Sequence, residues 1–213
     1  MESAFGRIEP LPSFHTGCHQ PLFGQFEAEN GNGDHVHHDV LWYERVGDVA
    51  VIDKSRIYGP PRWKEENPTG VNAGNHLKFY TYLFTPKGFD DAGQLPLLVL
   101  PHGGVHADFT TYYTHIVREL VERGYVVVAP EYRGSTGYGR SYWEAIDYGG
   151  LEIADVVAAR DWAVERYAFV DKGRVGIIGW SHGGLIALMS VFDHPKKFQA
   201  AYAGVPVSDL VAR

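Results

Sequence analysis

The chain has 213 residues, of which 45% are hydrophobic and 14% aromatic, so it is long and apolar enough to fold around a core of its own. Its formal net charge of −7 disfavours binding to nucleic acid and to anionic membrane surfaces. The single cysteine, Cys18, permits no internal disulfide, and the sequence shows neither a signal peptide nor an apolar run of the ~20 residues that a membrane helix needs. We therefore expect a cytoplasmic protein with no membrane or nucleic-acid partner.

Residues 1–75 are predicted to form an irregular amino-terminal segment, rich in Gly, Pro, Asn and His, in which only residues 49–52 have a strand pattern. The histidine-rich motif at residues 35–39 partly imitates a zinc signature of metallo-hydrolases. Val40 replaces the last histidine of that signature, and a loop-like stretch precedes the motif. We interpret the motif as a solvated loop, and we predict no metal and no other cofactor.

From residue 76 to residue 213 the pattern becomes regular and alternates apolar strands with helices. Strands are predicted at residues 77–84, 96–100, 125–129, 174–178 and 199–205, and helices at residues 112–122, 151–167 and 185–192. This alternation predicts an α/β domain with a mostly parallel sheet and helices on both faces. Within residues 151–167 the apolar residues share one side of the helix, and acidic residues such as Glu152 and Asp155 fall mostly opposite.

Ser181 lies in the motif Gly-Trp-Ser-His-Gly-Gly at residues 179–184, between a predicted strand and a predicted helix. This is the G-x-S-x-G nucleophile elbow in the context that it requires. A serine hydroxyl is a weak nucleophile, so it must be exposed beside a base, and the sharp turn between strand and helix exposes it. The glycines allow strand and helix to approach without Cβ clashes. We predict that Ser181 is a catalytic nucleophile rather than a structural turn residue.

A second motif, Pro-His-Gly-Gly at residues 101–104, directly follows a buried strand. A loop of small residues there can direct a backbone N–H group at the carbonyl oxygen of a substrate. The elbow supplies the other donor from the residue after the serine, His182. The alternative interpretation is a tight strand-to-helix turn that needs glycine.

Four motifs in order resemble those of the prolyl oligopeptidase family of serine peptidases, at residues 102–104, 132–139, 171–176 and 179–184. The resemblance extends from about residue 77 to the last residue. It implies an α/β-hydrolase catalytic domain, with Ser181 as the nucleophile and the backbone N–H groups of Gly104 and His182 as the oxyanion hole. His182 stands where many members of the family carry tyrosine.

The family's aspartate and histidine motifs have no counterpart in this sequence. In hydrolases of this fold both groups follow the serine in chain order, and only 32 residues follow Ser181. His194 is separated from Ser181 by a helix, which at ~1.5 Å per residue puts it too far away for a general base. The loop that begins at residues 101–104 is called the oxyanion loop, and His102 and His106 are interpreted as residues that brace it. Asp209 is an alternative position for the acid.

We therefore expect a chain that stops before the carboxyl-terminal strands of the fold, so that its last strand would be an unpaired edge. Such an edge favours poor solubility or self-association.

The function predicted from the sequence is that of a serine peptidase that cleaves peptide bonds through an acyl-enzyme on Ser181. Because residues 1–75 are too short for a β-propeller, which restricts access in larger members of the family, a carboxylesterase acting on small acyl esters is the first alternative. The second alternative is a catalytically incomplete fragment or a binding module without enzymatic activity.

Overall fold

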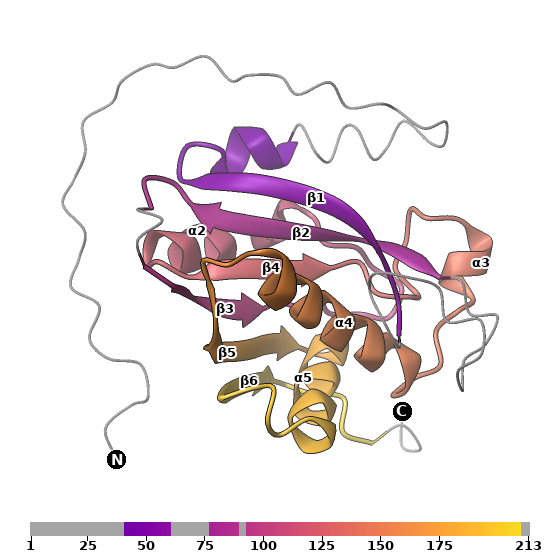
Figure 1. The fold of residues 1–213 in the computed structure, drawn as a ribbon. Helices are drawn as coiled ribbons and strands as arrows, with labels where there is room; N and C mark the ends of the chain where they lie inside the picture. The colour runs from indigo at the N-terminus through magenta and orange to yellow at the C-terminus, as the bar shows by residue number, and fades with distance from the viewer. Residues whose placement is uncertain (1–40, 61–76, 90–92, 210–213) are drawn as a thin grey trace.

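A computed structural model describes residues 41–60, 77–89 and 93–209 of the chain. Six strands form one sheet in the order β1-β2-β4-β3-β5-β6, as Figure 1 shows. The strands are β1 (Ala50–Tyr58), β2 (Lys78–Pro86), β3 (Leu95–Val99), β4 (Val126–Pro130), β5 (Val170–Trp180) and β6 (Ala200–Gly204). The four strands from β4 to β6 are parallel to one another, whereas β2 is antiparallel to both of its neighbours. The sheet is therefore mostly parallel, as the sequence predicted.

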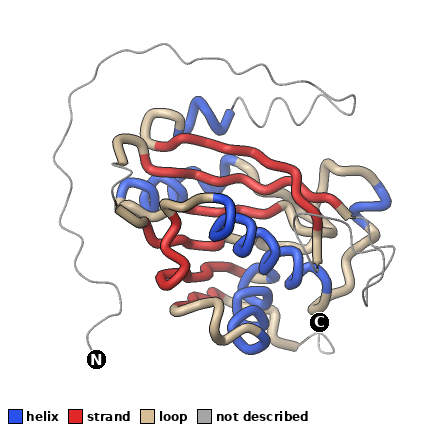
Figure 2. Tube along the Cα trace, in the orientation of Figure 1, coloured by secondary structure: helices blue, strands red, loops and turns tan. Residues whose placement is uncertain are grey.

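Helices cover both faces of this sheet, and Figure 2 shows them on either side of the strands. The helices are α2 (Thr114–Glu122), α3 (Arg140–Trp143), α4 (Leu151–Arg166) and α5 (His182–Asp193), with a 3₁₀ turn η1 (Thr111–Tyr113) before α2. Helices α4 and α5 share one apolar core with one face of the strands. Helix α2 packs with residues 41–46, which are also helical, against the opposite face. The two cores lie on opposite sides of the central strands.

The central strands are apolar on both faces because both faces are covered. All five residues of β4 are buried, and so are four of the five residues of β3. Burial on both faces explains why these strands read as continuous apolar runs in the sequence rather than as alternating patterns. Their carboxyl ends meet at one edge of the sheet, and the loops that follow them gather there.

Strand β1 lies within the segment 1–75, on the amino-terminal side of the predicted domain boundary. It pairs with β2 along its whole length, from Ala50 opposite Pro86 to Tyr58 opposite Lys78. The strand pattern predicted at residues 49–52 is therefore the beginning of a nine-residue strand. The boundary at residue 75 stays a prediction, as does the role of the segment before it. The histidine-rich motif at residues 35–39 and Cys18 lie outside the described residues.

The elements agree with the predicted ones in type and order, and they differ at their ends. Strand β5 begins at Val170 rather than at residue 174, and helix α5 begins at His182, directly after the serine. The predicted helix at residues 112–122 is split, because the Thr110 side chain caps a separate 3₁₀ turn by accepting a hydrogen bond from Tyr112 N. Helix α3, four residues long, was not predicted.

The acidic residues of α4 do not face solvent. Glu152 and Asp155 are fully buried, so the division of this helix into an apolar and a polar side does not describe its burial. Asp155 accepts two hydrogen bonds from the Arg133 guanidinium, at 2.7 and 2.8 Å, and a third from Arg133 N at 3.0 Å. This buried pair joins the loop after β4 to α4.

Burial raises the pKa of Asp155, although the bonds from Arg133 oppose that rise. The pKa of Arg133 is raised as well, because its bonds to Asp155 outweigh the opposing effect of burial.

No helix in the described part of the chain has both the length and the apolar character needed to span a membrane.

We predict that Asp155→Asn lowers the free energy of unfolding by about 3–5 kcal/mol, because it leaves the Arg133 guanidinium, which keeps its proton, buried without a counter-charge. Glu144→Gln is the matched control, since Glu144 pairs with Arg140 on the surface. Its expected effect is within about 0.5 kcal/mol. Urea unfolding monitored by circular dichroism measures both changes, and equal small effects would contradict the prediction.

Candidate active site

Ser181 lies between the last residue of β5 and the first residue of α5. Its backbone has φ 57° and ψ −120°, a conformation that residues with a side chain rarely adopt. Its N–H donates to Gly204 O at 3.0 Å, and its carbonyl accepts from Leu185 N at 3.1 Å and from Val207 N at 3.2 Å. These bonds hold the strained turn, which costs about 1–3 kcal/mol. The structure therefore has the geometry of a nucleophile elbow at the predicted position.

Glycines around Ser181 allow the surrounding backbone segments to touch. A Cβ atom on Gly183 would lie 2.5 Å from Pro101 O, and one on Gly103 would lie 3.0 Å from Trp180 O and 3.6 Å from the Ser181 Cβ. The loop after β3 therefore runs directly against the elbow. The two motifs, 78 residues apart in the sequence between Gly103 and Ser181, meet at the carboxyl edge of the sheet.

The backbone N–H groups of Gly104 and His182 are among those at this edge that have no hydrogen-bond partner in the described part of the chain. The neighbouring Gly103 N–H differs, because it donates to the Tyr113 hydroxyl at 2.9 Å. Gly104 has φ +68°, which a glycine adopts without strain. His182 is the first residue of α5, where an N–H has no partner within the helix. Both groups are available to a substrate oxygen.

Tyr132 holds the oxyanion loop from beneath. Its hydroxyl lies 3.0 Å from His102 O and 2.9 Å from Gly104 O, and it shares its single proton between these two carbonyls. Burial raises the pKa of Tyr132 well above its usual value, with further contributions from Glu131, Tyr113 and Glu152, so the phenol keeps its proton. Its ring stacks on the His102 ring at a centroid distance of 4.3 Å and lies 6.1 Å from the His182 ring. One side chain thus contacts both segments that carry the free N–H groups.

His102 is committed to bracing contacts rather than to solvent. Its side chain is fully buried, and its Nε2 atom lies 2.8 Å from Ser135 Oγ and 3.4 Å from Glu131 Oε2. Ser135 Oγ also donates to Tyr132 O at 2.6 Å, and His102 Nδ1 lies 3.1 Å from Gly103 O. These contacts agree with the interpretation of His102 as a residue that braces the loop.

His106 is also held by the loop after β4. Its Nδ1 atom lies 2.9 Å from Gly134 O, and its ring stacks on Trp143 of α3 at 3.7 Å. His194 follows the last residue of α5, as expected from the sequence. Within the described part of the chain, no residue is hydrogen-bonded to the partly exposed Ser181 hydroxyl. The structure therefore places none of these histidines as a base on Ser181.

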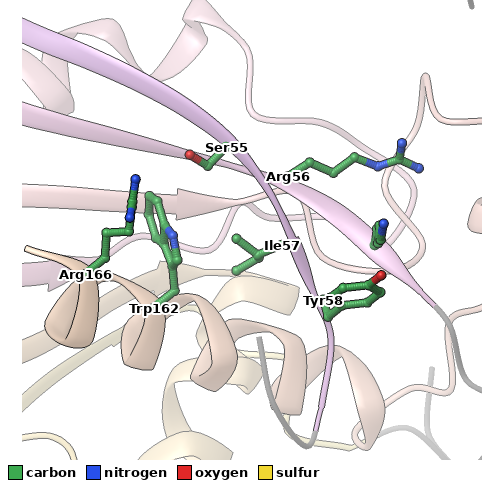
Figure 3. A pocket seen from close by; sticks show the side chains of 7 residues that line it. Ser55, Arg56, Ile57, Tyr58, Trp162 and Arg166 are labelled. Carbon is green, nitrogen blue, oxygen red and sulfur yellow. The ribbon is translucent and has the colours of Figure 1, made fainter. Parts of the chain in front are cut away.

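Among the hollows that the described residues line, two differ clearly in position. One, of about 610 Å³, lies at the carboxyl edge of the sheet and is lined by Trp143 with residues of the loop at 136–140. The other, of about 310 Å³, lies between β1 and α4, where Figure 3 shows Trp162 and Arg166 extending from the helix toward the strand. Neither is lined by Ser181, Gly104 or His182, so neither by itself marks the site.

The family model described as "Prolyl oligopeptidase family" matches residues 111–213 of this chain, which include the elbow and the loop after β4. Over these residues the chain is similar to members of the prolyl oligopeptidase family. The resemblance found in the sequence motifs is thereby confirmed.

Curated relatives of this family align with the chain at moderate identity. The mouse acylamino-acid-releasing enzyme is 32% identical over 138 residues, which are 64% of this chain and 19% of that enzyme. Human dipeptidyl peptidase 8 is 33% identical over 159 residues, 71% of this chain and 17% of that protein. The chain thus spans about a fifth of the length of the curated relatives that it matches.

Solved structures agree on the fold. A puromycin-hydrolyzing peptidase of Mycobacterium tuberculosis has a TM-score of 0.61 at 25% identity, over 76% of this chain and 23% of that one. The acylaminoacyl peptidase of Pyrococcus horikoshii has a TM-score of 0.62 at 18% identity, over 75% of this chain and 23% of that one. The α/β-hydrolase fold predicted from the sequence is confirmed.

Tyr132→Phe tests the brace beneath the oxyanion loop. The change leaves the carbonyls of His102 and Gly104 without their donor in a buried site, and we expect the free energy of unfolding to fall by about 1–3 kcal/mol. Amide hydrogen exchange in residues 102–106 should accelerate more than exchange in α4. Exchange that is unchanged in this loop would contradict the role given to Tyr132.

Proposed function

We propose that this chain carries the nucleophile and the oxyanion hole of a serine peptidase of the prolyl oligopeptidase type, which cleaves peptide bonds through an acyl-enzyme on Ser181. The observation that carries the proposal is the strained Ser181 turn beside the oxyanion loop, with a hydroxyl to which no described residue is hydrogen-bonded. The N–H groups of Gly104 and His182 support it, because they have no partner among the described residues and such donors suit a developing oxyanion.

In the proposed reaction, Ser181 Oγ attacks the carbonyl carbon of the scissile bond. The negative charge that develops on the carbonyl oxygen is stabilised by the N–H groups of Gly104 and His182, and by the positive end of the α5 dipole. Collapse of the tetrahedral intermediate breaks the C–N bond and leaves an ester on Ser181, and the proton that the hydroxyl gave to a base passes to the leaving amine. Water then attacks this ester and releases the acid.

This reaction needs a base at the Ser181 hydroxyl, and no described histidine is hydrogen-bonded there. That observation favours, as a second candidate, a chain without catalytic activity. Loss of triad members typically lowers the rate of such enzymes by several orders of magnitude. Activity of this chain is therefore decided by a measurement on Ser181 itself.

Peptides are the proposed substrates, because the similar proteins are named as acylamino-acid-releasing enzyme, dipeptidyl peptidase and puromycin-hydrolyzing peptidase. A carboxylesterase acting on small acyl esters is the alternative.

The net charge and the single cysteine, Cys18, support a cytoplasmic location without a nucleic-acid partner. Among the described strands β6 pairs only with β5, which supports the proposed self-association at this edge.

A fluorophosphonate probe, which reacts with activated serines, tests the proposal directly. The wild-type chain should label with one adduct at Ser181, identified by mass spectrometry of the tryptic peptide, and Ser181→Ala should abolish labelling. Ser141→Ala, at an exposed serine on α3, should label like the wild type. A folded wild-type chain that fails to label at Ser181 would overturn the catalytic proposal.

Three chromogenic substrates separate the alternatives. Hydrolysis of acetyl-alanine p-nitroanilide or glycyl-proline p-nitroanilide would support a peptidase. Hydrolysis of p-nitrophenyl butyrate alone would support the esterase. In each case the activity must disappear in Ser181→Ala.

A further inference from the structure

A buried pair of ionisable side chains lies directly beside the elbow. The Glu152 carboxylate comes from the first turn of α4, and the His182 imidazole comes from the first residue of α5. Neither side chain is exposed to solvent, and Glu152 Oε1 lies 3.3 Å from His182 Nε2. His182 is also the residue whose backbone N–H is proposed to bind the oxyanion. A side-chain contact on this residue therefore acts on the site without touching the substrate.

Glu152 is held rigidly in this position. Its carboxylate accepts hydrogen bonds from the backbone N–H groups of Gly149 and Gly150, the latter at 3.2 Å. Burial by itself would raise the pKa of Glu152, but its contacts with His182, Asp147 and the Gly149 N–H outweigh burial and lower that pKa to about 2. A fixed negative charge is thus present beside the imidazole at neutral pH.

The His182 ring has little else to fix it. Its aromatic neighbours are the rings of Tyr132 and Tyr148, at centroid distances of 6.1 and 6.4 Å. Neither ring nitrogen has an aligned hydrogen-bond partner among the described residues. The close approach of Glu152 is therefore the polar contact that sets which way the imidazole lies, and a buried polar ring without such a contact would be costly.

We propose that Glu152 is a positioning residue for the oxyanion hole. Its carboxylate holds the His182 imidazole, and through it the first turn of α5, so that the His182 N–H and the strained Ser181 keep their relative positions. This inference rests on the proposed function, because it takes the His182 N–H as an oxyanion donor. A positioning residue is needed at this site because an N–H donor displaced by a fraction of an ångström no longer matches the transition state.

A purely structural role makes a different prediction. If Glu152 served only to bind the Gly149 and Gly150 N–H groups at the start of α4, its loss would destabilise that helix and leave the chemistry at Ser181 unchanged. Glu152→Gln removes the charge beside His182 and keeps the shape and one of the two acceptor oxygens, so one of the Gly149 and Gly150 N–H groups loses its acceptor. Urea unfolding measures that structural loss, and the labelling of Ser181 measures the effect on the site. Asp161→Asn is the matched control, since Asp161 lies on the same helix and pairs with Arg160 and Lys197.

The test measures fluorophosphonate labelling of Ser181 as a rate constant of inactivation and a separate binding constant of the probe. We expect Glu152→Gln to lower the inactivation rate constant about tenfold with little change in probe binding, since misplacing a donor should cost less than the ~10²–10³-fold loss seen when one is removed. Asp161→Asn should stay within about twofold of the wild type. An unchanged inactivation rate in a folded Glu152→Gln protein would overturn the proposal.

A double-mutant comparison tests whether Glu152 acts through the imidazole. Glu152→Gln introduced into a His182→Ala protein should change the inactivation rate no further than about twofold, because the ring on which it acts is already absent. An additional tenfold loss in that background would overturn the proposed route.

A readout that does not depend on catalysis keeps this inference separate from the proposed function. Glu152→Gln should shift the ¹⁵N resonances of the His182 ring, assigned by their absence in His182→Ala, and should accelerate amide exchange at residues 182–184. These changes are expected even if the wild-type chain does not label, in which case the proposed function fails and the positioning contact stands. Unchanged ring resonances and exchange would overturn the positioning role by themselves.

Discussion

The hydroxyl of Tyr132 is the interaction on which the candidate site depends most. It holds the loop after β3 by its contacts with the carbonyls of His102 and Gly104, and the Gly104 N–H has no partner among the described residues. Tyr132 itself follows β4, and its ring contacts the imidazoles of His102 and His182. The loop after β3 and the elbow after β5 are thus built against one buried phenol that the loop after β4 supplies.

Buried charge surrounds this phenol and is matched by specific partners. Arg133 and Asp155 tie the loop after β4 to α4, and Glu152 ties α4 to the first residue of α5. On the other side, Glu131 accepts the Phe109 N–H at 2.9 Å and approaches His102. Each partner is costly to bury alone and acceptable in its pair. The arrangement fixes three separate loops relative to one another at the carboxyl edge of the sheet, where apolar packing alone would leave them loosely placed.

Much of this structure could be predicted from local sequence. The buried strands β3 and β4 are continuous apolar runs, and the elbow requires glycine at Gly183 because no larger residue fits against Pro101 O. The same close packing explains why the motif identified Ser181 so well. The nucleophile and its neighbouring N–H groups were therefore predicted at positions where the structure brings the two loops together, although their catalytic roles remain proposals.

The supporting residues could not be found in that way. Glu152 and Asp155 follow a helical pattern that would suit solvent. The burial of Asp155 depends on Arg133, 22 residues away in the sequence, and that of Glu152 on His182, 30 residues away. Tyr132 and Ser135 fall within a glycine-rich motif, but nothing local shows that the phenol reaches the carbonyls of another loop. The sequence does contain one signal. The stretch that forms α4 carries acidic residues among apolar ones, and the elbow motif carries a histidine with which one of them could pair.

The most direct test of this account is a crystal structure of the chain with a phosphonate bound covalently to Ser181, because the phosphonyl oxygen marks where the oxyanion would lie. The account predicts that this oxygen lies about 2.7–3.1 Å from both Gly104 N and His182 N. The Tyr132 hydroxyl should remain bonded to the carbonyls of His102 and Gly104. A phosphonyl oxygen bound by other groups, with the Gly104 and His182 N–H groups turned away from it, would contradict the account.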